Sequence, residues 1–371
     1  ILVVIIALLA CTPKQAQPAP VLVPQTRASV PGSPSTPTVT PEDAAWAQVV
    51  AAAKKEGKLT LYSFAFTGDI GLGLSRAFEE RYGISVEIIT GRGNEQIERL
   101  KTELRMGKVV GDFMETSNLN AVTAKDQGVV VPPGPLPVLQ EKGVWLVPPA
   151  LDAEGVVYSY VASPIALWIN TNIIRPGEEP KAWKNLLEPK WKGKILSLDP
   201  TVSSGPYLAF VPLLNNRVID EAYLRALGRQ DIVLDVQSTR ELFKKLAAGQ
   251  YPLFVGASGS TAGPIIMEGA PIRMVDMAEG VTVSGLGIAI VKNAPHPQAA
   301  RVFMNWLLSP EGPTLQSKLQ AAPPVRKDAT DFTPSAAKLI PQRLIPSTQK
   351  DLDDATRLFR EKYLTRIFTE R

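Results

Sequence analysis

The sequence predicts an α/β protein built as two lobes. About 330 residues follow a proline-rich N-terminal stretch, which is enough for two domains of ordinary size. Short apolar runs alternate with segments of helical spacing, and this alternation occurs twice, over 44–131 and over 161–276. Strands separated by helices are typical of parallel β-α-β units. We therefore expect each lobe to be a mostly parallel sheet flanked by helices.

The first eleven residues predict a lipid anchor. Ile1–Ala10 is apolar and too short to span a bilayer, and it is followed directly by Cys11, the only cysteine of the chain. Leu8–Cys11 resembles a bacterial lipobox, in which the cysteine is lipidated. The alternative is a short buried strand or helix. The lipobox places the protein in the cell envelope, either anchored on the outer face of the cytoplasmic membrane or in the periplasm.

Residues 12–42 predict a tether between this anchor and the folded part. They contain eight prolines among Ser, Thr, Ala, Gln and Val, a composition that favours extended polyproline II over a packed core. Because Cys11 is the one cysteine and is used for lipid, an internal disulfide is excluded and a thiol-based enzyme is disfavoured.

The first lobe is expected to contain 43–163 and 282–325. Gly57 and Gly83 follow two of its helical patterns, as glycine commonly does at a helix C-terminus. The expected helices cover 44–56, 69–82, 94–107 and 118–126, and the expected strands cover 59–63, 84–89, 112–115 and 286–291, with a helix over 298–308.

The second lobe is expected to contain 164–281 and 326–371. Its expected strands cover 165–169, 194–198 and 252–255, and its expected helices cover 207–214, 220–229 and 238–246, with a short helix and turn over 183–193. The amphipathic segment 351–367 is expected to pack on this lobe.

Composition excludes several functions. The net charge is +4, and Lys and Arg are interspersed with Asp and Glu, so no basic stripe predicts nucleic-acid binding. With one histidine and one cysteine, His-based triads and zinc sites are nearly excluded, and only carboxylate chemistry remains formally open. The chain also lacks a nucleotide-binding phosphate loop. We expect no enzyme and no cofactor.

Small polar residues follow five predicted strands. In α/β folds, ligands lie at the carboxyl ends of the strands, and helix N-termini there attract anions. The same Ser, Thr and Asn residues also serve as helix caps, which is the alternative reading. The candidate ligand-binding residues are Thr67, Arg92, Asn94 and Ser117 in the first lobe and Ser203, Ser204, Tyr207, Ser258 and Ser260 in the second.

The chain resembles the extracellular solute-binding proteins of ABC importers, in the cluster of ferric-iron-binding proteins. The resemblance covers most of 44–325 and is carried by phrases such as Ala77–Val86, Gly111–Ser117 and, most specifically, Gly285–Gly312. It implies a type 2 periplasmic-binding-protein fold, in which crossover strands join two lobes that close on a solute. It also implies an ABC permease and ATPase as partners, and we expect a monomer.

The resemblance weakens at the residues that bind iron. Ferric-binding members carry adjacent tyrosines at positions that match Gly259 and Ser260, and a carboxylate that matches Ser117. Ferric iron prefers such hard oxygen ligands. We therefore favour an oxyanion-bearing organic or phosphorylated solute, or an iron(III)–anion complex, over direct iron binding. A polyamine or thiamine would need carboxylates as binding partners, and the five loops contain few.

The alternative role is that of a sensor that presents its ligand to a membrane receptor.

Four other residues have competing interpretations. Arg92 is either a bidentate ligand of a phosphate or carboxylate, or a solvated surface arginine. Trp168 lies in an apolar strand, which favours core packing over stacking on a ligand. His296 lies in a turn before a helix, where a structural role is expected. Tyr160 precedes the expected crossover strand and is interpreted as a hinge or core residue.

Overall fold

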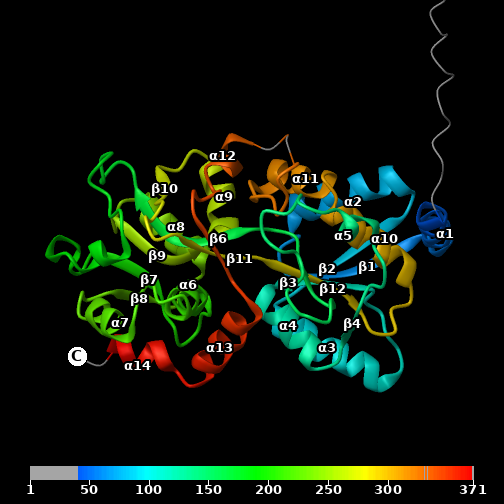
Figure 1. Cartoon of the computed structure of the whole chain (residues 1–371), viewed down its shortest axis with the longest axis horizontal. Helices are drawn as coiled ribbons and strands as arrows, with labels where there is room; N and C mark the ends of the chain where they lie inside the picture. Colours follow the sequence, from blue (N-terminus) through cyan, green and yellow to red (C-terminus); the bar gives the residue numbers. More distant parts are fainter. Residues whose placement is uncertain (1–40, 330, 332, 370–371) are drawn as a thin grey trace, which may run out of the picture. The chain divides into compact units, whose positions relative to one another are not determined.

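The computed structural model describes residues 41–371 except 330, 332, 370 and 371. The residues of the predicted lipid anchor, 1–11, and nearly all of those of the predicted tether, 12–42, lie outside the described part. Figure 1 shows two β-sheets, each with helices on both faces. In the described part of the chain, no helix has the length and apolar character that crossing a membrane requires.

The first sheet has the strand order β2–β1–β3–β12–β4, and β5 also pairs with β12. β1, β2 and β3 are parallel, whereas β12 runs antiparallel to β3. The strands are β1 (Lys58–Ser63), β2 (Ser85–Thr90), β3 (Phe113–Ser117), β4 (Val130–Val131), β5 (Tyr158–Ser159) and β12 (Leu286–Val291). The helices around it are α1 (Pro41–Glu56), α2 (Gly68–Tyr82), α3 (Gly93–Met106), α4 (Asn118–Asp126), α5 (Pro137–Gln140), α10 (Pro297–Leu308) and α11 (Glu311–Gln320).

The second sheet has the order β13–β11–β6–β9–β7–β8, and β10 pairs with β6. β7 is parallel to both β8 and β9. The strands are β6 (Ser163–Asn170), β7 (Ile195–Leu198), β8 (Val233–Asp235), β9 (Leu253–Ser258), β10 (Ile272–Met274), β11 (Val281–Ser284) and β13 (Leu344–Pro346). The helices are α6 (Gly205–Asn215), α7 (Glu221–Gly228), α8 (Thr239–Ala247), α9 (Gly259–Met267), α12 (Pro334–Ala337), α13 (Gln349–Arg360) and α14 (Tyr363–Thr369), with 3₁₀ turns at Trp183–Leu187 and Pro189–Trp191.

The expected elements are present, with boundaries that differ by a few residues. Ten shorter or weakly patterned elements had no predicted counterpart: β4, β5, β8, β10, β11, β13, α5, α9, α11 and α12. α9 has glycine at its first and fifth positions and a proline at its sixth, so its helical pattern is weak. The segment 351–367, expected to be amphipathic, lies in two helices, α13 and α14, which pack on α6 and α7.

Strand pairing brings the two sheets together at one place. Ser117 at the end of β3 pairs with Leu286, two residues after Ser284. Ser284 pairs with Ser163 at the start of β6. Two residues further along β6, Ile165 pairs with Ser258, the last residue of β9. The carboxyl ends of β3 and β9 therefore both lie beside the Ser163–Ser284 pair.

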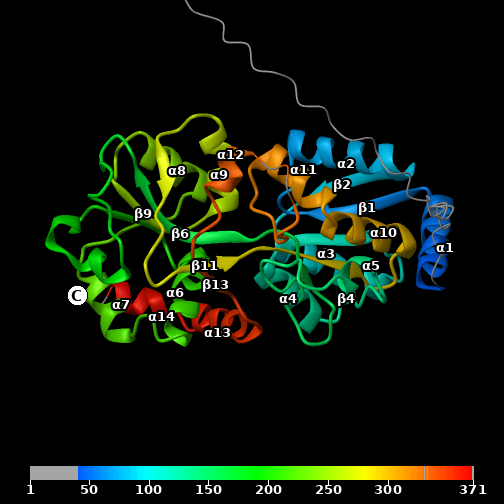
Figure 2. The same cartoon turned by 45° about the horizontal axis from the view of Figure 1, so that its top comes forward.

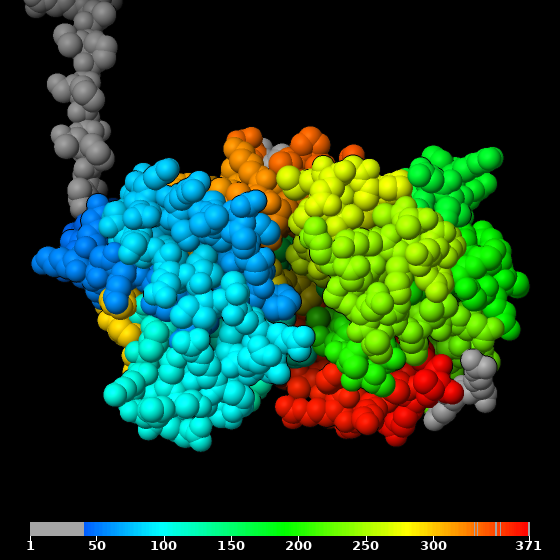
Figure 3. Space-filling view, turned by 180° about the vertical axis from the view of Figure 1, so that it is seen from behind, coloured from blue at the N-terminus to red at the C-terminus, as the bar shows by residue number. Residues whose placement is uncertain are grey.

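This pairing determines which loops face one another. Because parallel strands end at a common edge, the loops after β1, β2 and β3 gather on one side of the crossover and those after β7, β8 and β9 on the other. The space-filling view from behind shows a hollow between the blue-to-cyan part of the chain and the yellow-green part (Figure 3). We refer to this hollow as the cleft.

Candidate functional site

Three serine hydroxyls lie together on the second-sheet side of the cleft. The Oγ of Ser258 lies 2.7 Å from the Oγ of Ser163 and 2.8 Å from that of Ser260. The backbone N–H of Ser260 donates to the Oγ of Ser163 at 2.9 Å. We call Ser163, Ser258 and Ser260 the serine cluster. It joins the first turn of α9 to the crossover strand β6, so the start of this helix is fixed relative to the hinge.

A β-bulge directs the end of β9 toward this cluster. The register between β6 and β9 shifts between Ala166 and Leu167, which leaves Gly256 without a partner. Gly256 has φ +80°, a conformation that favours glycine. A Cβ on the neighbouring Gly205 would lie 2.8 Å from the carbonyl oxygen of Gly256. α6 and β9 therefore approach closely beside the cleft, and the small residues there are needed for packing.

The start of α6 supplies the next hydroxyls. The Oγ of Ser203 accepts a hydrogen bond from the backbone N–H of Gly205 at 3.2 Å, so Ser203 acts in part as a helix cap. Ser204 precedes the helix directly, and its side chain makes no capping hydrogen bond. Both serines are partly exposed. Of this pair, Ser204 is the one whose hydroxyl is not used to cap its helix.

On the first-sheet side, a buried carboxylate holds the loop after β1. Glu115 in β3 is fully buried. Its Oε2 accepts hydrogen bonds from the Ser63 hydroxyl at 2.6 Å, the Phe64 N–H at 3.0 Å and the Ala65 N–H at 2.9 Å. Its Oε1 accepts from the Tyr160 hydroxyl at 3.1 Å. One side chain thus connects the β1 loop to the segment that leads into the crossover.

Burial governs the ionisation of this pair. Desolvation raises the pKa of Glu115, and the four donors oppose the rise because they favour the carboxylate. Burial and the neighbouring Glu115 raise the pKa of Tyr160 well above its usual value. Tyr160 is therefore a neutral donor at the hinge, which confirms its interpretation as a hinge or core residue.

The first-sheet candidate residues divide into two groups. Thr67, Arg92 and Asn94 are exposed at the starts of α2 and α3. The guanidinium of Arg92 forms no ion pair with any residue that the structure describes. Ser117, in contrast, accepts a hydrogen bond from the N–H of Asn120 and caps α4. At Ser117 the capping interpretation is correct.

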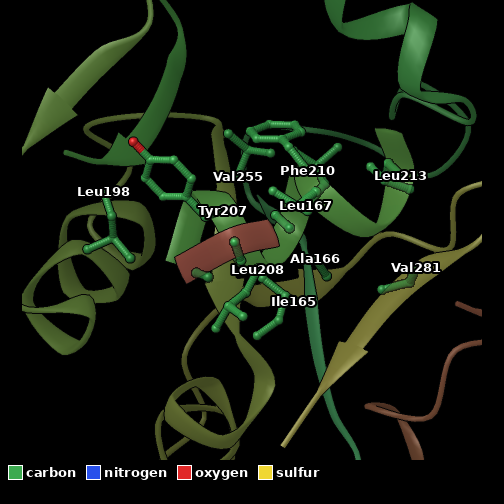
Figure 4. Close-up of a cluster of buried hydrophobic side chains, with 14 of the residues drawn as sticks. Ile165, Ala166, Leu167, Leu198, Tyr207, Leu208, Phe210, Leu213, Val255 and Val281 are labelled. Carbon is green, nitrogen blue, oxygen red and sulfur yellow. The ribbon is translucent and has the colours of Figure 1, made fainter. Parts of the chain in front are cut away.

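Tyr207 is a correction to the expected site. It lies in α6 with no exposed surface and packs edge-on against Phe359 of α13, with ring centroids 5.3 Å apart. Figure 4 shows it in a cluster of buried hydrophobic side chains, beside Leu208 and Phe210. α6 is apolar along nearly its whole length, so its third residue points into the core. Tyr207 is therefore not accessible to a solute in the cleft.

Trp168 and His296 have the structural roles favoured for them. Trp168 is fully buried, and its indole N–H donates to the carbonyl of Ala257 at 2.8 Å. His296 precedes α10, where its backbone N–H and its Nδ1 both contact the buried carboxylate of Asp112, at 2.6 Å and 2.9 Å. Asp112 precedes β3, so it lies at the opposite edge of the first sheet from the cleft.

The second-sheet loops contain acidic residues that the sequence analysis overlooked. Asp199 follows β7, and its Oδ1 accepts hydrogen bonds from the N–H and hydroxyl of Thr201 at 2.7 Å and 2.6 Å. Asp235 ends β8 and pairs with Lys245, which lowers the pKa of the Asp235 carboxyl. The position of Asp199 directly after the expected strand 194–198 was visible in the sequence, whereas that of Asp235 was not, because β8 was not expected. Both carboxylates are engaged in holding their own loops.

No tyrosine pair occurs at the start of α9, where Gly259 and Ser260 stand. A Cβ at Gly259 would lie 2.7 Å from the ring of Pro164, so this position has no room for a larger side chain without movement of that proline. Among the residues from 41 onward that the structure describes, no group of three or more His, Cys, Asp and Glu side chains is placed to hold a metal ion.

Comparison with known proteins finds a family model and relatives that match most of the chain. The model of a family described as bacterial extracellular solute-binding protein matches residues 73–341, more than half of the chain. The iron uptake protein A1 of Synechocystis is 23% identical over 247 residues, which cover 62% of this chain and 66% of that protein.

Solved structures share the fold. An IdiA (FutA) protein of Trichodesmium, in complex with iron and citrate, superposes with a TM-score of 0.67 at 20% identity and covers 84% of this chain and 99% of its own. The periplasmic binding protein AfuA of Actinobacillus pleuropneumoniae, with fructose-6-phosphate bound, gives a TM-score of 0.64 at 18% identity, with 84% and 99% coverage. The two-sheet architecture is that of type 2 periplasmic binding proteins.

Proposed function

The chain belongs to the bacterial extracellular solute-binding proteins, and we propose that it binds a small solute with an oxyanion group in the cleft and delivers it to an ABC permease. A solute-binding role of the ABC-importer type is common to this family and its relatives. The permease and its ATPase are the proposed partners. The proposed attachment to the envelope is the lipid anchor at Cys11, followed by the proline-rich tether.

One observation carries the choice of an oxyanion. The ends of β3 and β9 lie beside the same crossover pair, so helix starts from both sheets border one cleft. Thr67, Ser204 and Ser258 make no capping hydrogen bond at the starts of α2, α6 and α9. Each helix start contributes about 0.3–1 kcal/mol to binding a nearby anion. Arg92 adds a full positive charge.

The proposed contacts come from both sheets. Thr67, Arg92 and Asn94 would bind from the first sheet, and Ser203, Ser204, Ser258 and Ser260 from the second. Ser117 keeps its place at the edge of the cleft, but its hydroxyl is engaged with Asn120. Tyr207 is left out because it is buried. Two related folds contain anionic molecules, citrate with iron in one and fructose-6-phosphate in the other.

Iron would enter this site only together with an anion. Direct binding would need phenolate or carboxylate oxygen. Gly259 and Ser260 supply neither, and the hydroxyl of Tyr160 donates to Glu115. An iron(III)–anion complex remains compatible, because the hydroxyls and N–H groups would contact the anion. Presentation of the solute to a membrane receptor would use the same cleft.

A thermal-shift screen tests the proposal. Ferric citrate, phosphate, phosphonates, sugar phosphates, free ferric iron, thiamine and putrescine would be added to the purified protein. A ligand at a hundredfold excess over its Kd stabilises the folded state by about 2.7 kcal/mol. We expect stabilisation by at least one oxyanion compound and none by putrescine. Stabilisation by free ferric iron alone would contradict the proposal.

Two substitutions test whether the ligand-induced thermal shift arises from binding in the cleft. Ser260→Leu and Ser204→Leu should abolish the ligand-induced shift and leave the melting point of the free protein nearly unchanged, because both side chains are partly exposed. Ser85→Leu is the matched control, since Ser85 is exposed at the opposite end of β2. It should leave the ligand-induced shift intact.

A further inference from the structure

Exposed apolar side chains gather at the same strand ends as the hydroxyls. In the described part of the chain, eight large hydrophobic side chains are exposed. Three of them directly follow or lie close after strands that end at the cleft: Phe64 after β1, Val202 after β7 and Val236 after β8. They are 50%, 59% and 67% exposed. Single exposed hydrophobics are ordinary, but these three all follow strand ends that border the cleft.

The other five are not at these strand ends. Met106 and Met267 end α3 and α9, and so lie a helix length away from the cleft. Val110 precedes β3 and Ile173 follows β6, which places both at other edges of their sheets, and Leu72 is in the second turn of α2. Three of the eight exposed apolar side chains therefore follow strand ends at the cleft, one on the first sheet and two on the second.

The turns that carry these three side chains are held firmly. The N–H of Phe64 donates to the backbone and side-chain oxygens of Glu115, both at 3.0 Å. The N–H of Val202 donates to the carbonyl of Asp199 at 3.2 Å. Directly after Val236, the N–H of Gln237 donates to the Asp235 carboxylate at 2.9 Å. The apolar groups are thus presented by ordered turns, which lowers the entropic cost of binding.

We propose that the solute is an amphipathic organic anion, whose oxyanion is bound by the helix starts and whose apolar group packs against Phe64 on one side and Val202 and Val236 on the other. This inference rests on the proposed function and narrows its substrate class. Adjacent strands are about 4.8 Å apart. The apolar residues after β1, β7 and β8 are one or two strands away from the ends of β3 and β9, where the crossover lies.

Burial of an apolar group is the physical reason for the preference. Each Å² of apolar surface removed from water contributes about 25 cal/mol. A phenyl group buries far more of this surface than a methyl group does. Inorganic phosphate, or a sugar phosphate without an apolar substituent, would leave the three side chains exposed to water. Such ligands would gain no binding free energy from these side chains.

Isothermal titration with two probes tests the inference. Phenylphosphonate and methylphosphonate carry the same oxyanion and differ only in the apolar group. We expect phenylphosphonate to bind the native protein at least about tenfold more tightly. Phe64→Ser and Val202→Ser should each reduce this ratio severalfold while methylphosphonate affinity changes little. Met106→Ser, a control at an exposed apolar side chain outside the cleft, should leave the ratio unchanged.

The outcomes separate the inference from the proposed function. Equal affinity for both phosphonates would overturn the apolar subsite and leave oxyanion binding in place. If Phe64→Ser weakened both probes equally, the apolar side chains would be packing against each other on closure, and the inference would be wrong. No binding of either phosphonate, or of any other oxyanion in the thermal-shift screen, would overturn both.

Discussion

The two sides of the cleft are positioned by different chemistry. On the first sheet, one fully buried carboxylate, Glu115, accepts hydrogen bonds from the β1 loop and from Tyr160. On the second sheet, the partly buried hydroxyls of the serine cluster bond to one another and to one backbone N–H. A buried charge is costly to leave without partners, whereas hydroxyls rotate and exchange partners easily. The first side is therefore held by one buried carboxylate, whereas on the second side the hydroxyls themselves can exchange partners with a ligand.

Removing the buried carboxylate should have the largest effect. Glu115→Leu would leave the Ser63 hydroxyl, the Ala65 N–H and the Tyr160 hydroxyl without this acceptor, whereas the Phe64 N–H would keep the backbone carbonyl of residue 115. Since each buried donor without a partner costs about 1–3 kcal/mol, we expect at least about 3 kcal/mol lost from the free energy of unfolding. Urea denaturation measures this.

Glu115→Gln is the matched control. Its amide oxygen can take the place of Oε2, and its NH₂ group can donate to the Tyr160 hydroxyl, so we expect a loss of only about 1 kcal/mol. Equal small losses for Leu and Gln would show that Glu115 does not organise this side of the cleft.

A substitution at the crossover, where the two sides of the cleft meet, should cause the second-largest loss of stability. A Cβ at Gly285 would lie 2.1 Å from the carbonyl oxygen of Val161 and 2.3 Å from the Oγ of Ser159. Because the first of these atoms belongs to the backbone, relief requires the crossover to shift, and we expect Gly285→Ala to cost about 2–3 kcal/mol in thermal or urea unfolding. Gly83→Ala, at a left-handed helix end with open space around it, should cost only about 1 kcal/mol. The reverse order would contradict this account of the crossover.

The serine cluster should give a smaller change in stability. Ser258→Ala removes the hydroxyl that contacts Ser163 and Ser260, but the backbone N–H of Ser260 keeps its bond to Ser163. We expect about 1 kcal/mol lost from the free energy of unfolding, well below the cost of Glu115→Leu. A loss as large as that of Glu115→Leu would remove the difference between the two sides.

The pH dependence of stability gives the smallest and most specific signal. Burial raises the pKa of Glu115 in the folded protein above its ordinary value of 4.5. The folded state then binds this proton more tightly than the unfolded state does, so this group's contribution to stability falls as pH rises from about 4.5 through the raised value. Glu115→Gln lacks this titration. The stability of the native protein minus that of the variant should therefore decrease across this window, and a constant or increasing difference would contradict the raised pKa.

Local patterns in the sequence were sufficient for most of the fold. Apolar runs and terminal glycines such as Gly83 located the main strands and helices, because these depend on residues near in sequence. The pairing of Ser117 with Leu286 and of Ser163 with Ser284 depends on residues far apart and could not be inferred locally. The bulge at Gly256 likewise depends on pairing between strands far apart in the sequence.

The sequence predicted which types of residue lie at the candidate site, but it predicted the role of each residue less well. Ser117 and Ser258 have similar surroundings in the sequence, yet Ser117 caps its helix and Ser258 bonds across the crossover. Tyr207 was misassigned because its α6 position was judged by nearby serines, whereas the packing of α13 against α6 buries it. The importance of Glu115 was missed because its partners lie about fifty residues away in sequence.

A crystal structure of the protein grown with phenylphosphonate tests the central claim most directly. The account predicts the phosphonate oxygens within hydrogen-bonding distance of groups at the starts of α3 and α9 at once, with the phenyl ring against Phe64. A probe bound to one sheet only, or at another surface such as the 430 Å³ pocket between α4 and α13, would contradict it.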